Sequence, residues 1–233
     1  MKYLMIVLLA TSSFSALAVD RKDISDVDTD LMVEDTQVFF SGTADDHFAT
    51  FWWIPVEFWQ STFLKDPTIS PAETEAMLQA MEGVSIIAVV QADISVFGAF
   101  RFYPREEIAS TMSVTYIDHA GNGVSIVREE NVNPDLELLL DTIGPLLTAA
   151  MGEMGQNMHF YVYSDYTPKG ERLVDPHEFG KLEVNLKRLS GEEIVDGIEM
   201  PLNSLFEPRI CPNGKPAHVQ WSFCPWSGEA LEE

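Results

Sequence analysis

Short segments in which apolar and polar residues alternate, separated by turn signals, fill the centre of this sequence. Residues 84–96 begin apolar on both faces and then alternate, a pattern typical of a central strand that ends at the solvent. Residues 112–118 and 124–128 flank Asn122-Gly123, a dipeptide that favours the tight turn of a β-hairpin. Further strands are expected at residues 36–41, 100–103, 159–164, 172–174 and 181–187. Because hairpin strands pair antiparallel, the pattern predicts an α+β fold with a mostly antiparallel sheet and packed helices.

Two segments carry clear helix signals. Residues 70–83 open with Ser-Pro-Ala-Glu, a capping box with proline at the first helical position, and close with glycine. Residues 133–154 begin with Asn-Pro and repeat apolar side chains at the i, i+3, i+4 and i+7 spacing of a buried helical face. They predict a core helix with a kink at Pro145, since proline cannot donate the backbone hydrogen bond of a helix interior.

A third helix is expected in the aromatic segment between residues 48 and 63, which contains seven aromatic side chains. A continuous helix would gather six of them on an arc of about 140° and leave Trp53 outside it, whereas Pro55 favours a helix that begins at the proline. An arc of this width normally packs on a sheet as core. The alternative is that some of Trp52, Trp53 and Trp59 stay exposed and form a stacking platform for a sugar, a peptide or a partner helix.

The first eighteen residues have the features of an export signal. Lys2 precedes an apolar run over residues 4–10, and small residues flank Leu17 directly before the expected cleavage after Ala18. The apolar run is much shorter than the roughly 20 residues of a membrane span, and no later stretch approaches that length. The sequence therefore predicts an exported protein, periplasmic or secreted, without a membrane span.

An acidic segment follows the export signal. Residues 19–35 contain seven acids and little periodicity, which favours a flexible arm before a main domain over residues 36–208. Asp26, Asp28 and Asp30 have the spacing of the first ligands of a calcium loop, but Leu31 stands where that loop requires glycine. No calcium site is expected.

Charge limits the partners of this chain. It has 37 acidic and 14 basic residues, and its formal charge is −23. A negative charge of this size repels phosphate backbones and anionic lipid headgroups, so nucleic acids are not expected partners. The expected partner is a protein or a small molecule that the sequence does not identify.

The two cysteines lie in a repeated pattern near the C-terminus, Cys211-Pro-Asn-Gly and Cys224-Pro-Trp-Ser-Gly. Residues 211–231 resemble a degenerate zinc ribbon, a hairpin module in which each knuckle supplies two cysteines to one tetrahedral metal. Gly214 and Ser227 stand where the second cysteine of each knuckle would be, and His218 is the remaining nearby ligand. Half of the cysteines are therefore missing, and no metal or other cofactor is expected.

The same resemblance implies a disulfide. Zinc-ribbon ligands converge on one point, so the first cysteines of the two knuckles, Cys211 and Cys224, would lie close enough to be joined. An oxidising export compartment favours the joined form. Residues 209–233 are thus expected to form a disulfide-closed, ribbon-like hairpin, and ribbons of this kind serve as interaction modules.

One group of residues could carry catalysis. Asp175 and His177 would project from the same face of an extended segment, with Glu178 adjacent, as an acid/base or metal-binding group. Asp-Pro is also a common start of a turn, and nucleophile, zinc-protease, phosphate-loop and dinucleotide motifs are absent from the sequence. The sequence favours a non-catalytic binding or interaction protein of the cell envelope, acting through an aromatic surface or the ribbon-like module. The alternative is a metal-dependent or acid/base hydrolase that uses Asp175, His177 and Glu178.

Overall fold

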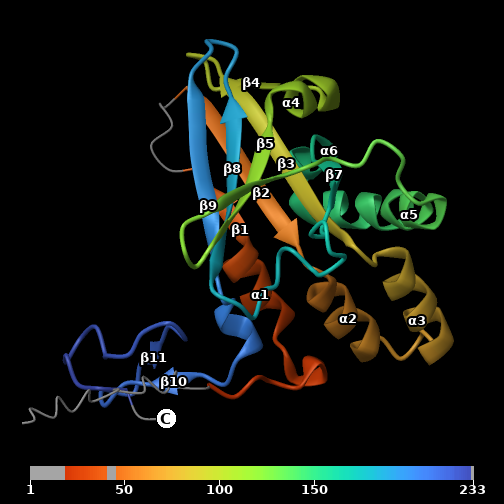
Figure 1. The fold of residues 1–233 in the computed structure, drawn as a ribbon. Coiled ribbons are helices and arrows are strands. Elements are labelled where there is room, and N and C mark those ends of the chain that lie inside the picture. The colour runs from red at the N-terminus through yellow and green to blue at the C-terminus, as the bar shows by residue number, and fades with distance from the viewer. Residues whose placement is uncertain (1–18, 41–45, 232–233) are drawn as a thin grey trace, which may run out of the picture.

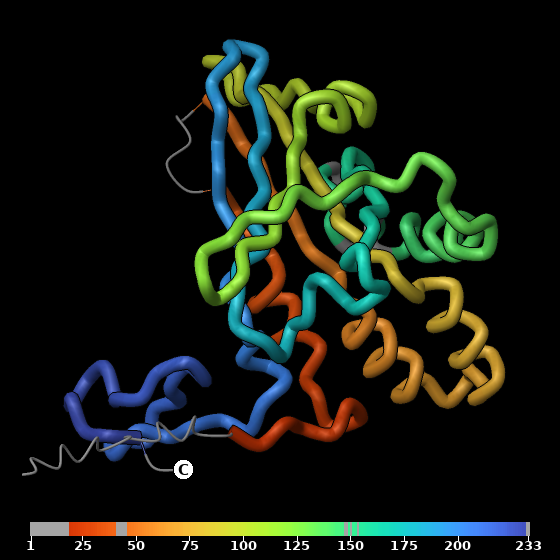
Figure 2. The backbone as a smooth tube through the Cα atoms, in the orientation of Figure 1, coloured from red at the N-terminus to blue at the C-terminus, as the bar shows by residue number. Residues whose placement is uncertain are grey.

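The structure is a computed structural model that describes residues 19–40 and 46–231. Two antiparallel sheets pack face to face, and helices cover the outer face of the first sheet (Figure 1 and Figure 2). A short hairpin near the C-terminus has its own small core beside this body. The α+β class and the antiparallel pairing expected from the sequence are confirmed.

The central strand of the first sheet is β3, which pairs with β2 along one edge and with β4 and β7 at opposite ends of the other edge. The strands of this sheet are β1 (Gln37–Phe39), β2 (His47–Ile54), β3 (Val84–Ile94), β4 (Phe100–Phe102) and β7 (His159–Ser164). The second sheet has the order β6-β5-β8-β9. Its strands are β5 (Ser113–Asp118), β6 (Gly123–Ile126), β8 (Gly180–Lys187) and β9 (Glu193–Met200).

The helices join the strands, and several of them cover the outer face of the first sheet. They are α1 (Thr29–Thr36), α2 (Val56–Lys65), α3 (Pro71–Ala80), α4 (Arg105–Thr111), α5 (Pro134–Met151) and α6 (Glu153–Gln156), with short 3₁₀ turns η1 (Ile24–Asp26) and η2 (Asn203–Leu205). The predicted capping box of α3 is present, because Ser70 and Glu73 exchange side-chain and backbone hydrogen bonds. Helix α5 begins after Asn133, as expected, and runs through Pro145.

Both faces of the first sheet are buried, and this places the core in two layers. In β2, Phe51 and Trp53 face the second sheet, whereas Trp52 and Ile54 face the helices. Strand β3 divides its apolar side chains in the same way, since successive side chains of a strand point to opposite faces. A strand that is apolar on both faces can only be stable between two layers, and here these layers are the second sheet and the helices α2, α3 and α5.

The second sheet buries one face only. Leu182, Val184 and Leu186 of β8 point into the space between the sheets and are fully buried. The residues between them are polar, and Lys181 lies 3.5 Å from Glu183 on the outer face. This alternation is typical of an antiparallel sheet with one solvent-facing side.

The prediction of a flexible arm over residues 19–35 is wrong. This segment contains η1 and most of α1, and Val27 and Met32 are buried in the core between the sheets. Asp28 caps α1 by accepting hydrogen bonds from two backbone amides of its first turn. Acidic residues thus occupy the exposed side and the cap of a short helix that buries Met32, and Asp35 accepts a hydrogen bond from the Ser204 backbone amide.

The aromatic segment is divided at Pro55 into a strand and a helix. Residues 47–54 form β2, so a continuous helix over residues 48–63 is wrong, whereas the helix start at the proline is confirmed by α2. The aromatic residues of this segment therefore follow the two-residue period of a strand before Pro55 and the helical period after it. Trp52 and Trp53 alternate across the sheet, and Trp59 and Phe63 lie four residues apart on one face of the helix.

Other differences concern short elements. Residues 172–174 do not form a strand, because Arg172 makes only an isolated bridge with Tyr166. Helix α4 and strand β9 were not predicted from the sequence. The expected export signal, residues 1–18, lies outside the described residues. Within the described ranges, no helix is long and apolar enough to cross a membrane.

The C-terminal hairpin, β10 (Arg209–Ile210) with β11 (Pro216–Ala217), is closed by the predicted disulfide between Cys211 and Cys224. The disulfide packs with Ala217 and Leu231 as a small separate core. The buried Arg209 guanidinium donates hydrogen bonds to the Trp221 and Leu231 carbonyl oxygens. We call residues 209–231 the C-terminal module.

A buried polar contact fastens the two sheets together. The Gln91 side-chain amide of β3 donates to the Lys187 carbonyl oxygen of β8 at 3.1 Å and lies 3.3 Å from Nε2 of His47. Because this amide nitrogen is a donor, Nε2 of His47 must accept, so the imidazole is neutral. Burial, and next Arg188, hold the pKa of His47 below its usual 6.5, against the opposing effect of the nearby carboxylates Asp93, Asp46 and Glu192.

His47 should therefore make stability depend on mildly acidic pH. Its folded pKa lies below its unfolded pKa, so its contribution is complete above pH 6.5 and is lost as the pH falls toward the lowered value. We expect the free energy of unfolding to fall by up to about 1.4 kcal/mol per pH unit in this window, and H47N to remove that part of the slope. Urea denaturation between about pH 7 and 5 measures it.

The matched control is H119N, at the exposed tip of the β5–β6 hairpin, which should keep the slope of the original protein. Equal slopes for H47N and the original protein would contradict this assignment.

The disulfide should stabilise the C-terminal module locally. It joins positions 13 residues apart, and closing a loop of this size in the unfolded chain contributes about 3 kcal/mol. In the C211A/C224A variant we expect faster hydrogen exchange at the Gly214 and Gly228 amides, which donate to the Cys211 and Cys224 carbonyl oxygens. Amides of β3 should be unchanged. Two reactive thiols in the denatured, unreduced protein would contradict the pairing.

Candidate functional site

A cleft of about 790 Å³ lies between helices α2 and α3. The two helices form a hairpin around residues 66–70, and their facing sides supply most of the walls. Apolar side chains dominate these walls, among them Val56, Phe63, Leu64, Ile69, Leu78 and Met81. Leu64 is 52% exposed although it is a large apolar residue, because its neighbours leave the cleft open.

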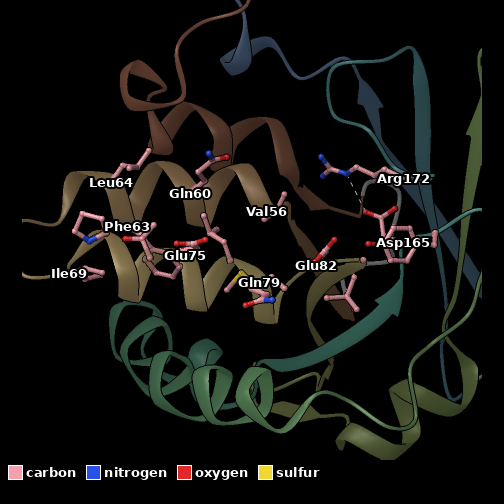
Figure 3. Close-up of a pocket in the computed structure, with 17 residues that line it drawn as sticks. Val56, Gln60, Phe63, Leu64, Ile69, Glu75, Gln79, Glu82, Asp165 and Arg172 are labelled. Carbon is pink, nitrogen blue, oxygen red and sulfur yellow. Dashed lines mark ion pairs between the residues drawn. The ribbon is translucent and has the colours of Figure 1, made fainter. Parts of the chain in front are cut away.

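Polar groups close one end of the cleft. Asp165 and Arg172, from the loop after β7, lie at the end opposite Leu64 and Ile69 (Figure 3). The Asp165 backbone amide donates to the Gly83 carbonyl oxygen at 2.8 Å, and this bond fixes the loop to the start of β3.

The Tyr166 ring packs directly on Gly83. A Cβ atom at position 83 would lie 1.9 Å from the ring, and the backbone there has φ +76°. Only glycine satisfies both conditions, since L-residues rarely adopt positive φ and the ring is too close. Gly83, which the sequence marks as the end of a helix signal, therefore also positions an aromatic wall of the cleft.

Asp165 is the centre of a buried hydrogen-bond chain. Trp53 Nε1 donates to Ser85 Oγ at 3.2 Å, and the Ser85 hydroxyl donates to Asp165 Oδ2 at 3.1 Å. The Val174 amide donates to the other carboxylate oxygen at 2.7 Å. Burial raises the pKa of Asp165 above its usual value, although the Val174 amide and Arg172 act in the opposite direction.

Arg172 is held by two carboxylates. Its guanidinium makes a two-pronged contact with Glu57 of α2 at 2.5 and 3.1 Å, and its Nε lies 3.5 Å from Asp165. Glu57 is buried, and the Arg172 side chain is 30% exposed. The positive charge of Arg172 is therefore balanced by two carboxylates, and these contacts connect α2 to the loop after β7.

Acidic side chains remain unpaired around the cleft. Glu75 and Glu82 of its lining are exposed, and neither forms an ion pair with any residue that the structure describes. A smaller hollow of about 500 Å³ shares Gln79, Glu82 and Tyr166 with the cleft and adds Asp135 of the α5 N-terminus. Of the described residues that line this hollow, none is basic. Glu82 and Tyr166 thus stand at the junction of an apolar cleft and an acidic hollow.

The structure brings two of the three predicted catalytic residues into contact. Asp175 Oδ1 lies 3.0 Å from His177 Nδ1, and it also accepts from the His177 backbone amide. The hydrogen bond from the His177 side chain lowers the pKa of Asp175 to about 2. Glu178 points to Arg21 at the surface, at 3.4 Å.

These contacts are those of an aspartate that closes a turn around Pro176. None of the three residues lines the cleft or the hollow. Among the residues with described positions, no group of three or more histidine, cysteine or acidic side chains is arranged to hold a metal ion. A catalytic role for Asp175, His177 and Glu178 stays a prediction.

The three tryptophans considered as a binding platform are core residues. Trp52, Trp53 and Trp59 are 5%, 0% and 2% exposed, because β2 lies between two covered faces and α2 packs on the sheet. The expectation that the aromatic segment packs as core is therefore confirmed, and the alternative that some of Trp52, Trp53 and Trp59 stay exposed is wrong. Trp52 donates through Nε1 to Thr36, and Trp53 to Ser85.

Three exposed aromatic side chains lie on the C-terminal module, where Trp221, Phe223 and Trp226 are 43%, 62% and 51% exposed. Lys215 Nζ lies 5.1 Å from the centre of the Trp226 ring. The two knuckle-like turns repeat one backbone pattern: Gly214 donates to the Cys211 carbonyl oxygen, and Gly228 donates to that of Cys224.

The polar end of the cleft was not predicted from the sequence. Glu57 and Arg172 are 115 residues apart, so no local spacing pattern joins them. The available signal was Asp165 itself, an acid within the otherwise apolar and aromatic stretch around β7, where a buried charge needs partners.

No family model, curated protein or solved structure matches this chain. The function is therefore inferred from the geometry and chemistry of the cleft.

The Glu57–Arg172 contact should be strongly stabilising for the wall of the cleft. R172M leaves the Glu57 and Asp165 carboxylates buried without their cation, and we expect a loss of about 3 kcal/mol in the free energy of unfolding. E57Q/R172M should recover part of this loss, because it removes both charges of the pair. Urea denaturation of the two single variants and the double variant measures the coupling.

The matched control is R21M, which breaks the exposed contact between Arg21 and Glu178 and should cost less than about 1 kcal/mol. Equal losses for R172M and R21M would show that the buried network does not hold the cleft.

Proposed function

We propose that this protein is a non-catalytic binding protein whose ligand is a small molecule with an apolar part, held in the cleft between α2 and α3. The observation that carries the proposal is an open cleft of about 790 Å³ with apolar walls and a few convergent polar groups at one end. This combination of size and lining is typical of small-molecule sites. The cleft is formed mainly by one helical hairpin, so a ligand would contact α2 and α3 together.

The pairing of the polar groups supports binding over catalysis. Glu57, Asp165 and Arg172 hold one another, and Asp165 is further fixed by Ser85 and by a backbone amide. A general acid or base must be free to exchange a proton with a substrate. Here the charged groups act as a rigid end wall. The alternative, a metal-dependent or acid/base hydrolase, is supported by the contact between Asp175 and His177, which lies outside the cleft.

We also propose that the protein works outside the cytoplasm, in the periplasm or after secretion. The export features of residues 1–18, with cleavage after Ala18, support this location, and so does the disulfide between Cys211 and Cys224. The resemblance of residues 211–231 to a degenerate zinc ribbon stays a proposal, supported by the repeated turn pattern at the two cysteines.

The cleft should bind a neutral apolar dye such as Nile red, and binding should depend on Leu64. Covering Leu64 with the ligand should contribute about half the free energy of burying a leucine, about 1 kcal/mol. L64S removes this contribution, so the dissociation constant should rise about fivefold. Fluorescence titration measures it. The matched control is L138S, because Leu138 of α5 is also exposed, at 67%, but does not line the cleft. Equal effects of L64S and L138S, or no binding of the dye, would argue against the cleft as the binding site.

A further inference from the structure

The cleft has a charge asymmetry that selects the headgroup of its ligand. Its lining includes Glu75, Glu82 and Asp165 but only one basic residue, Arg172. The Arg172 charge is engaged by Glu57 through two short contacts and faces Asp165 as well. At the end of the cleft formed by Asp165 and Arg172, an anionic headgroup would meet more negative than positive charge, whereas a cationic headgroup would meet the unpaired carboxylate of Glu82.

The position for a cation is the junction between the cleft and the smaller hollow. Glu82 lies beside Gly83, whose carbonyl oxygen is bonded to the Asp165 amide, so Glu82 belongs to the polar end (Figure 3). The Tyr166 ring packs on Gly83, is 43% exposed, and lines both the cleft and the hollow. Asp135 adds another carboxylate in the hollow. A carboxylate beside an exposed aromatic ring is the combination that attracts ammonium groups.

The other end of the cleft suits an apolar chain. Phe63, Leu64 and Ile69 lie away from Asp165 and Arg172, and Glu82 lies toward Asp165, whereas Glu75 lies nearer Phe63 (Figure 3). We propose, resting on the function proposed above, that the ligand is an amphiphilic cation. Its apolar chain lies between α2 and α3, and its ammonium head sits at Glu82 and Tyr166.

The test compares three probes that share a ten-carbon chain and differ in the head: decyltrimethylammonium, decanol and decanoate. Isothermal titration calorimetry below their micelle concentrations gives the dissociation constants, and displacement of Nile red shows that each occupies the cleft. We expect the cation to bind about tenfold more tightly than decanol, and decanoate to bind more weakly than decanol. The preference for the cation should decrease at high salt.

Two variants separate a specific headgroup site from the general attraction of a chain with charge −23 for cations. E82Q and E137Q each remove one negative charge from an exposed side chain, but Glu137 lines neither the cleft nor the hollow. E82Q should bring the affinity for decyltrimethylammonium down to that for decanol and leave decanol binding unchanged. E137Q should change neither.

The outcomes distinguish the two proposals. If decanol and the cation bind equally, or if E82Q and E137Q have the same effect, the headgroup assignment is wrong and the cleft remains a binding site. If decanoate binds most tightly, the assignment is also wrong, and Arg172 is the group that recognises the head. If none of the probes displaces Nile red and L64S changes nothing, the proposed function itself fails.

Discussion

The burial of β2 and β3 on both faces is the constraint on which the rest of the structure depends. Phe51 and Trp53 require a cover on one side, and Trp52 and Ile54 require a cover on the other. The second sheet provides the first cover and the helical layer provides the second. The helical hairpin α2–α3 is therefore positioned by the need to cover the sheet, and the cleft is the part of that hairpin that this packing leaves open.

The polar network at the end of the cleft connects the core to the proposed site. It begins at Trp53 in the layer between the sheets, passes through Ser85 to Asp165, and ends at Arg172 and Glu57 on the helical side. Trp53, Ser85, Asp165, Arg172 and Glu57 each have a partner in this network, which is the condition for placing charges there without a large desolvation cost. A fixed end wall of this kind favours a site with a constant shape, in agreement with binding as the proposed role.

The elements that could be predicted were those with local signals. The capping box at Ser70, the hairpin turn at Asn122 and the strand over residues 84–96 depend on neighbours in the chain, and the structure has all three. The prediction of a flexible arm over residues 19–35 is wrong because the burial of Val27 and Met32 depends on distant parts of the chain, which the local acidic composition does not show. The sequence left open whether some tryptophans of the aromatic segment stay exposed, because exposure depends on what covers the segment; all three considered are buried.

The sequence by itself determined the antiparallel α+β class and, through resemblance to a zinc ribbon, the pairing of Cys211 with Cys224. The class follows from periodicity and turn chemistry, and the pairing is what the resemblance implies. Only the tertiary structure decided the cleft and its acidic end, because Glu57 and Arg172 lie 115 residues apart and meet only when the sheet and its helical cover are assembled. Whether charged side chains face one another depends on their positions in space. For residues far apart in the chain, those positions are set by the packing of the two faces of the central sheet.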